Sequence, residues 1–313
     1  MNFLETQIHL LKKERNIYEE AELFEQNRIP VSELLPMLAS PAETNAPLKL
    51  EGDVLTCSES STTYHIRNHV VDFCKNEFEQ SGDEWARLNE QFMRYHKSLS
   101  VYTLVNSKPL LNYLGEKSGI NQLKNATVVD VGGGTGHTLC TFFKHPETLK
   151  YILADPNLRL LHDQFLRLYP ALAQLSMGHV LCYAEKLPFR NDSADLVMSL
   201  SSIDHFKDFH AFFREAYRIC KPGGKIFVSS HLDVPANKRI QRVSASSKVF
   251  SYSFWERLSR YLYYRKYKVG TDDHTQHFET IKPIEDAMKA AGFKTNEKEE
   301  FYGYFWITGS KGA

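Results

Sequence analysis

The feature that most constrains the fold is a regular alternation of strand-like and helix-like segments through the middle of the chain. Short apolar runs rich in β-branched residues are separated by stretches in which apolar residues recur at helical spacing. Consecutive parallel strands need long crossover connections, so this alternation is typical of a parallel sheet with helices on both faces. The expected strands are residues 127–131, 151–155, 179–183, 194–200 and 225–231.

The first expected strand runs into a glycine-rich loop at residues 132–136. Glycines are needed where the backbone turns tightly and lets a ligand approach without a Cβ in the way. Asp155 ends the next strand, about 20 residues further on, where an acid can accept hydrogen bonds from both ribose hydroxyls of an adenosine. A nicotinamide cofactor fits less well, because the next glycine of the dinucleotide fingerprint is His137 here.

Three further blocks follow the loop, at residues 184–189, 193–199 and 218–225. In their order and spacing, the sequence resembles the class I S-adenosylmethionine-dependent methyltransferases, in particular the small-molecule group that includes ubiquinone and menaquinone biosynthesis enzymes. The resemblance implies a Rossmann-like, seven-stranded α/β sheet that uses S-adenosyl-L-methionine as its cofactor. It also implies methyl transfer to a small organic acceptor, a specialised metabolite or a quinone-like ring, with oxygen, nitrogen or carbon left undecided as the acceptor atom.

Carried over position by position, the resemblance implies a cofactor site along the carboxyl edge of the sheet. An acid in the first strand and the glycine backbone would border the methionine part and the ribose, the acid after the second strand would hold the ribose hydroxyls, and the residues after the third strand would line the adenine. The end of the fourth strand would lie under the sulfonium. The implied residues, in chain order, are Asp130, Gly132, Gly133, Gly134, Asp155, Pro156, Tyr183, Ala184, Glu185, Ser199 and Leu200.

One position departs from the family pattern. Tyr183 stands where the family often has an acid that accepts a hydrogen bond from the adenine amino group. A phenol can still accept that bond or pack beside the ring, so we expect altered affinity and not loss of binding.

No fixed catalytic motif is expected, because the cofactor carries an already activated methyl group. The protein must align the acceptor and, for a hydroxyl or an acidic C–H, remove a proton. His205 follows the fourth strand, on the loop that faces the transferred methyl in this fold, and histidine titrates near neutral pH. His277, with His274, lies where the chain returns to the sheet. A packing role for His205 and a surface-loop role for the other two are the alternatives.

The N-terminal part divides into two expected units. Residues 1–47 form a helical arm that ends in a proline-rich connector. Residues 48–78 form a small β hairpin with turns at residues 52–53 and 67–68. The hairpin is similar to the second half of the zinc ribbon found fused to or partnering some methyltransferases. Cys57 lacks the close pairing cysteine of such a ribbon, so we expect no metal.

Residues 79–313 form the expected methyltransferase domain, with helical character over residues 79–120. Residues 234–278 are longer than a simple connection and mix aromatic with basic side chains. Their spacing predicts an amphipathic helix, which would either cover a flat acceptor as a lid or pack on the N-terminal helices. A membrane-surface or RNA-binding role for the basic run at residues 260–268 is a minor alternative.

Composition restricts the function classes. The 38 Lys and Arg residues balance 38 Asp and Glu residues, which argues against a nucleic-acid-binding surface. No apolar run approaches the roughly 20 residues that span a bilayer, and the start of the chain lacks a signal-peptide core. Five scattered cysteines do not describe a disulfide framework. We therefore expect a cytoplasmic enzyme without stable membrane insertion. The alternatives are a non-catalytic cofactor-binding scaffold or regulatory subunit and, less compatibly, a nicotinamide-dependent oxidoreductase.

Overall fold

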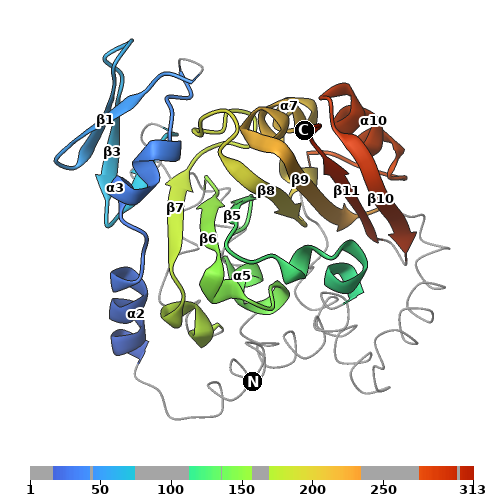
Figure 1. Ribbon diagram of the computed structural model, residues 1–313, viewed down its shortest axis with the longest axis horizontal. Helices are drawn as coiled ribbons and strands as arrows, with labels where there is room; N and C mark the ends of the chain where they lie inside the picture. Colours follow the sequence, from blue (N-terminus) through green and yellow to red (C-terminus); the bar gives the residue numbers. More distant parts are fainter. Residues whose placement is uncertain are drawn as a thin grey trace.

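The structure is a computed structural model that describes residues 17–42, 45–74, 113–134, 136–156, 169–233, 275–301 and 304–313. Within these residues the strands form one sheet in the order β1-β2-β3-β4-β7-β6-β5-β8-β9-β11-β10 (Figure 1). The expected helical stretch at residues 79–112, the arm before residue 17, and residues 234–274 with His274 lie outside the described residues.

The five strands expected from the alternating pattern are all present and run parallel to one another. A final hairpin completes the seven strands expected from the family resemblance, and its second strand lies antiparallel between β9 and β10. The seven are β5 Thr127–Val131, β6 Lys150–Ala154, β7 Met177–Leu181, β8 Ala194–Leu200, β9 Cys220–His231, β10 Lys294–Phe301 and β11 Tyr304–Ser310.

The sheet has eleven strands instead of seven, because the N-terminal hairpin continues it. The four added strands are β1 Leu48–Glu51, β2 Val54–Cys57, β3 Thr63–Arg67 and β4 Val70–Asp72.

The pairing at the β7 edge explains this extension. β4 runs parallel to β7, with Val70 opposite His179, and the Ile29 N–H donates to the Met177 carbonyl nearer the start of β7. An unpaired edge strand exposes backbone donors and acceptors that another segment of chain can satisfy. The turn between β3 and β4 uses Asn68 and His69, both with positive φ, as a two-residue turn of type I′ requires. Hence the N-terminal segment covers an edge that the seven-stranded sheet would leave open.

Side chains alternate between the two faces of the sheet and build two cores. On one face, Val129 and Val131 pack with α3 Val31–Leu34, α7 Phe209–Ile219 and α10 Lys282–Ala290. On the other face, Val128 packs with the remaining helical elements. These include α2 Ile17–Gln26, η2 Ile120–Gln122, α5 His137–Phe142 and η5 Pro170–Gln174. Short helical turns are also present at η1 Leu35–Met37, η3 Pro146–Thr148 and η6 Ile203–His205, and residues 113–118 are helical as well.

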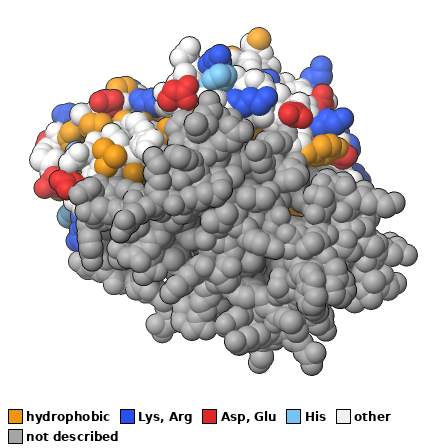
Figure 2. Space-filling model, turned by 90° about the horizontal axis from the view of Figure 1, so that it is seen from below, with side chains coloured by type: hydrophobic (Ala, Val, Ile, Leu, Met, Phe, Trp, Pro, Cys, Tyr) orange, Lys and Arg blue, Asp and Glu red, His pale blue; other side chains and the backbone are white. Residues whose placement is uncertain are grey.

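The part of the described surface that is visible in Figure 2 is mixed in charge. Where Figure 2 shows that part from below, basic and acidic side chains are interspersed instead of gathering into a patch of one sign. None of the helices in the described ranges is long and apolar enough to cross a membrane.

Candidate functional site

The glycine loop after β5 has a conformation that requires glycine. Gly132 and Gly134 have φ of 70° and 57°, in the left-handed region that side chains disfavour. A Cβ on Gly132 would lie 2.7 Å from the Ser202 side chain, and one on Gly133 would lie 2.4 Å from an Asp130 carboxylate oxygen. Because both positions are this crowded, any side chain there would displace the neighbouring groups. This loop, which packs tightly against the neighbouring side chains at the carboxyl end of β5, is called the glycine cradle.

Asp155 joins this cradle to the next strand. It directly follows β6, is largely buried, and its Oδ2 accepts a hydrogen bond of 2.9 Å from the Gly134 N–H. The Gly132 N–H donates to the Ala154 carbonyl at 2.8 Å. The acid expected to hold a ribose thus lies in direct contact with the glycine loop. Pro156, the next residue, is half-buried beside it.

Asp130 is a buried carboxyl group within β5 itself. The Tyr151 hydroxyl donates to its Oδ2, whereas no hydrogen bond reaches its Oδ1 within the part of the chain that the structure describes. Burial raises the pKa of Asp130 to about 7; the Tyr151 hydrogen bond opposes this rise and the charge of Asp155 adds to it. A nearby cation would stabilise the ionised form of this buried carboxyl group. S-adenosyl-L-methionine is cationic at its sulfonium and amino groups, so this carboxyl group and the glycine cradle fit that cofactor.

The residues expected beside the adenine lie just past the end of β7. The Tyr183 side chain is exposed, and the Lys207 ammonium lies 5.7 Å from its ring centre. Ala184 is buried, and the Glu185 carboxylate accepts a hydrogen bond from the Asp208 N–H at 3.1 Å. The accessible phenol ring offers a flat surface on which a planar base can pack.

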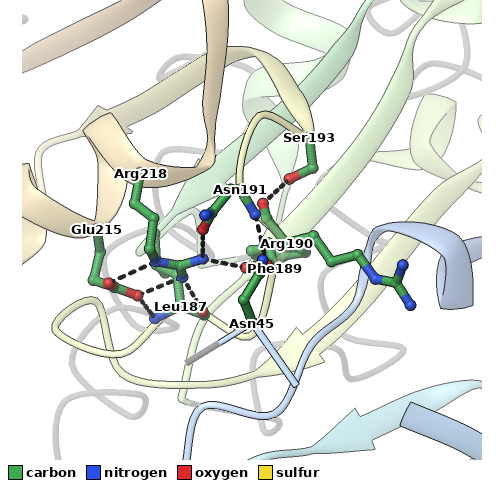
Figure 3. A network of polar contacts seen from close by, with 8 residues as sticks. All are labelled: Asn45, Leu187, Phe189, Arg190, Asn191, Ser193, Glu215 and Arg218. Carbon is green, nitrogen blue, oxygen red and sulfur yellow. Dashed lines mark hydrogen bonds and ion pairs between the residues drawn. The ribbon is translucent and has the colours of Figure 1, made fainter. Parts of the chain in front are cut away.

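The segment that carries these residues is fastened from both sides (Figure 3). From α7, the Arg218 guanidinium pairs with Glu215 at 2.7 Å and donates to the carbonyls of Leu187 and Phe189. From the N-terminal segment, Asn45 Oδ1 accepts a hydrogen bond from the Asn191 N–H. These supports could not be predicted from the sequence, because Arg218 and Asn45 lie far along the chain from Leu187 and Asn191, the residues that they hold.

The Ser199 side chain is turned inward. Ser199 is fully buried, and its hydroxyl lies 2.7 Å from that of Ser202, which in turn donates to the Val131 carbonyl. These bonds fasten the loop after β8 against the loop after β5. Leu200 is half-buried and packs on the core. Ser202 could not be identified from the sequence; the absence of a side chain at Gly132, whose Cβ would collide with Ser202, is the only local sign of this contact in the described structure.

His205 lies on that same loop, at the end of η6. It is half-buried, and its backbone N–H donates to the Ser202 carbonyl at 3.0 Å. The neighbouring Phe206 ring would lie 3.3 Å from a Cβ on Gly132. The loop that carries His205 is therefore packed directly on the glycine cradle.

His277 reaches this edge of the sheet from the far end of the chain. Its Nδ1 lies 2.6 Å from Oδ2 of Asp233, two residues beyond β9. The preceding residue, Gln276, donates its backbone N–H to the Asp204 carbonyl at 2.8 Å. Asp233 was not found from the sequence, since its relation to His277 depends on how the chain returns across 44 residues.

Comparison with known proteins decides the family. The profile of a methyltransferase domain family matches residues 104–298, more than half of the chain. The chain belongs to this methyltransferase family. The expectations of a class I enzyme with a Rossmann-like sheet, using S-adenosyl-L-methionine as its methyl donor, are confirmed.

Individual relatives align with part of the chain. The methyltransferase is 39% identical over 106 residues to the chloroplastic 2-methyl-6-phytyl-1,4-hydroquinone methyltransferase of Spinacia oleracea, over 33% of this chain and 28% of that protein. It is 25% identical over 197 residues to the ubiquinone/menaquinone biosynthesis C-methyltransferase UbiE of Pectobacterium carotovorum, over 62% of this chain and 73% of that one. The first of these matches spans less than a third of the relative's length. Since the spinach protein is chloroplastic, the cytoplasmic location of the present chain stays a prediction.

A solved structure agrees with the fold. An S-adenosyl-L-methionine-dependent methyltransferase of Methanococcus maripaludis superposes with a TM-score of 0.50 at 18% identity. The similarity covers 75% of this chain and 97% of that one. The fold is thus shared where little sequence identity remains.

Proposed function

We propose that this methyltransferase acts on a small quinone-like acceptor in its reduced, hydroquinone form. The similarity to two enzymes whose names specify hydroquinone and quinone-pathway methylation supports this acceptor class. The use of S-adenosyl-L-methionine in this proposal is supported by the cluster of Asp130, Asp155 and the glycine loop. The atom that receives the methyl group is either a ring carbon or a hydroxyl oxygen of such an acceptor.

The cofactor-binding roles follow from this arrangement. We assign the ribose hydroxyls to Asp155 and the cationic methionine part to Asp130 together with Gly132, Gly133 and Gly134. We assign the adenine to a pocket built by Pro156, Tyr183, Ala184 and Glu185, and the region under the sulfonium to Ser199 and Leu200. The buried Ser199 hydroxyl is already used by Ser202, so its contribution is to hold the loop and not to contact the methyl group.

The bound cofactor supplies a methyl group on a positively charged sulfur, which is reactive without further activation. The chain's own residues orient the acceptor in line with that methyl group and exclude water. A hydroquinone loses a proton when it is methylated at oxygen or carbon, so a base is useful near the acceptor. His205 and His277, both at the carboxyl edge, are our candidates for it.

The test combines binding with turnover. Calorimetric titration should give binding of S-adenosyl-L-methionine and S-adenosylhomocysteine and none of NADH. Incubation with 2-methyl-6-phytyl-1,4-hydroquinone should then yield a product heavier by one methylene group in mass spectrometry. Cofactor binding without turnover of this or other hydroquinones would support the non-catalytic scaffold instead, and NADH binding alone would contradict the cofactor assignment.

A further inference from the structure

We propose that Asp233 and His277 form a carboxylate–imidazole pair that accepts the proton lost by the methyl acceptor. In this pair His277 is the base, and Asp233 is a positioning residue that fixes the orientation and tautomer of its ring. The inference rests on the proposed function and names the residues that handle the proton within it.

The pair is held rigidly by its neighbours. Besides the 2.6 Å contact between Nδ1 and Oδ2, the Asp233 N–H donates to the Phe278 carbonyl at 2.7 Å. Phe278 is buried and packs edge-on against Phe209, with ring centres 5.4 Å apart. Backbone and side-chain contacts therefore join the two short segments. Such double attachment is what keeps a catalytic group in its productive orientation.

The pair also lies close to the cofactor loop through a short chain of contacts. The Gln276 side chain donates to the carbonyls of Phe206 and Lys207, at 3.3 and 3.2 Å. The Phe206 ring borders Gly132 in the glycine cradle. Among the described residues, Phe206 and Gln276 thus connect the cofactor loop to the segment that carries His277. The pair is at the edge of the sheet where an acceptor must meet the methyl group.

The chemistry of the contact selects one tautomer. When a carboxylate accepts a hydrogen bond from Nδ1–H, the proton stays on Nδ1 and the Nε2 lone pair becomes the acceptor. The His277 side chain is 66% exposed, so an acceptor of hydroquinone size can approach it.

The proposed step balances in atoms and charge. The nucleophilic oxygen or carbon of the acceptor forms a bond to the methyl carbon as the methyl–sulfur bond breaks, and the electron pair remains on the now neutral sulfur. The proton of the acceptor's hydroxyl, or of its methylated ring carbon, passes to Nε2 of His277. The carboxylate of Asp233 stabilises the resulting imidazolium. Because the pair is partly exposed, the proton can then leave to solvent.

The first test needs no acceptor. Nitrogen-15 NMR of the imidazoles should show His277 protonated at Nδ1 in the neutral wild-type protein, and Asp233→Asn should shift it towards the Nε2-protonated tautomer. His277→Gln identifies the signal. An Nε2-protonated ring in the wild type, or an unchanged tautomer in Asp233→Asn, would overturn the pairing even if the enzyme never turns over a hydroquinone.

The second test measures turnover with 2-methyl-6-phytyl-1,4-hydroquinone. Asp233→Asn should lower kcat about a hundredfold, with the KM for acceptor and the affinity for S-adenosylhomocysteine nearly unchanged. Asp233→Glu should restore part of the rate. Glu147→Gln is the matched control. Glu147 lies 3.9 Å from the His145 ring just before β6, at the amino end of the parallel strands and therefore away from the site. An unchanged kcat in Asp233→Asn would remove the pair from proton transfer.

Discussion

Replacing Asp130 by asparagine should stabilise the protein and weaken cofactor binding at the same time. The buried carboxyl group has a pKa of about 7, whereas its ordinary value is 3.8. The folded protein therefore favours the protonated acid. Ionising it lowers the free energy of unfolding, and this cost is absent at low pH. That cost begins as pH rises above 3.8, grows until the pH reaches about 7, and stays constant beyond.

The expected magnitude follows from the linkage relation. One pKa unit is worth about 1.4 kcal/mol, so the cost of the buried carboxylate grows by about 3 kcal/mol between pH 5 and pH 8. Asparagine carries no titrating group and can still accept the Tyr151 hydrogen bond. The free energy of unfolding of Asp130→Asn, minus that of the wild type, should increase over this range by an amount of that order.

The assay is urea unfolding of both proteins, without cofactor, at several pH values. Taking the difference between them removes the contributions of other titrating groups. Asp53→Asn, in the exposed turn between β1 and β2, removes the same charge at the surface and serves as the control. A difference that does not change with pH would refute the buried-carboxylate argument.

Calorimetry provides the functional half of this prediction. Binding a cation beside Asp130 requires the carboxylate, so wild-type affinity for S-adenosyl-L-methionine should fall about tenfold from pH 8 to pH 6. The Asp130→Asn variant should bind more weakly at pH 8 and show less of this dependence. A variant as tight as the wild type at pH 8 would place the cationic end of the cofactor elsewhere.

Three further perturbations test other parts of the site and its support. Asp155→Ala should weaken cofactor binding by about 1 to 3 kcal/mol in calorimetry, because ribose hydroxyls lose a charged acceptor; unchanged affinity would contradict the ribose assignment. Gly133→Ala should destabilise the fold by about 1 to 3 kcal/mol and abolish cofactor binding, since its Cβ would collide with Asp130 and Leu153; normal binding would show that the cradle can relax. Burial, with the charge of Arg28, lowers the pKa of His179 to about 3, so stability is lost as pH falls below 6.5. His179→Leu should remove about 3 kcal/mol of that loss between pH 7 and pH 4, measured by urea unfolding; an equally steep loss in the variant would place the acid sensitivity elsewhere.

Local sequence determined the central strands and the glycine loop. The strands of the parallel core are mostly apolar because both of their faces are buried, and such segments can be recognised directly in the sequence even where Asp130 or His179 interrupts them. The loop could be predicted from its glycines, because a positive φ and the close approach of another group both require glycine at such a position. The cofactor acid Asp155 was predictable since it stands at a fixed distance along one strand–helix–strand unit.

Only the tertiary structure decided which segments meet across the sheet. The short strands of residues 48–72 look like an independent hairpin in the sequence, and their pairing with β7 depends on an edge formed by residues more than a hundred positions away. The fastening of Leu187 by Arg218, and of Asn191 by Asn45, is equally non-local. So is the contact between Asp233 and His277, which are brought together by the return of the chain to η6. Hydrophobic patterns and glycine positions depend on residues that are neighbours in the sequence, so they can be recognised from the sequence alone. Hydrogen bonds between distant segments depend on how the chain packs, so only the tertiary structure shows them.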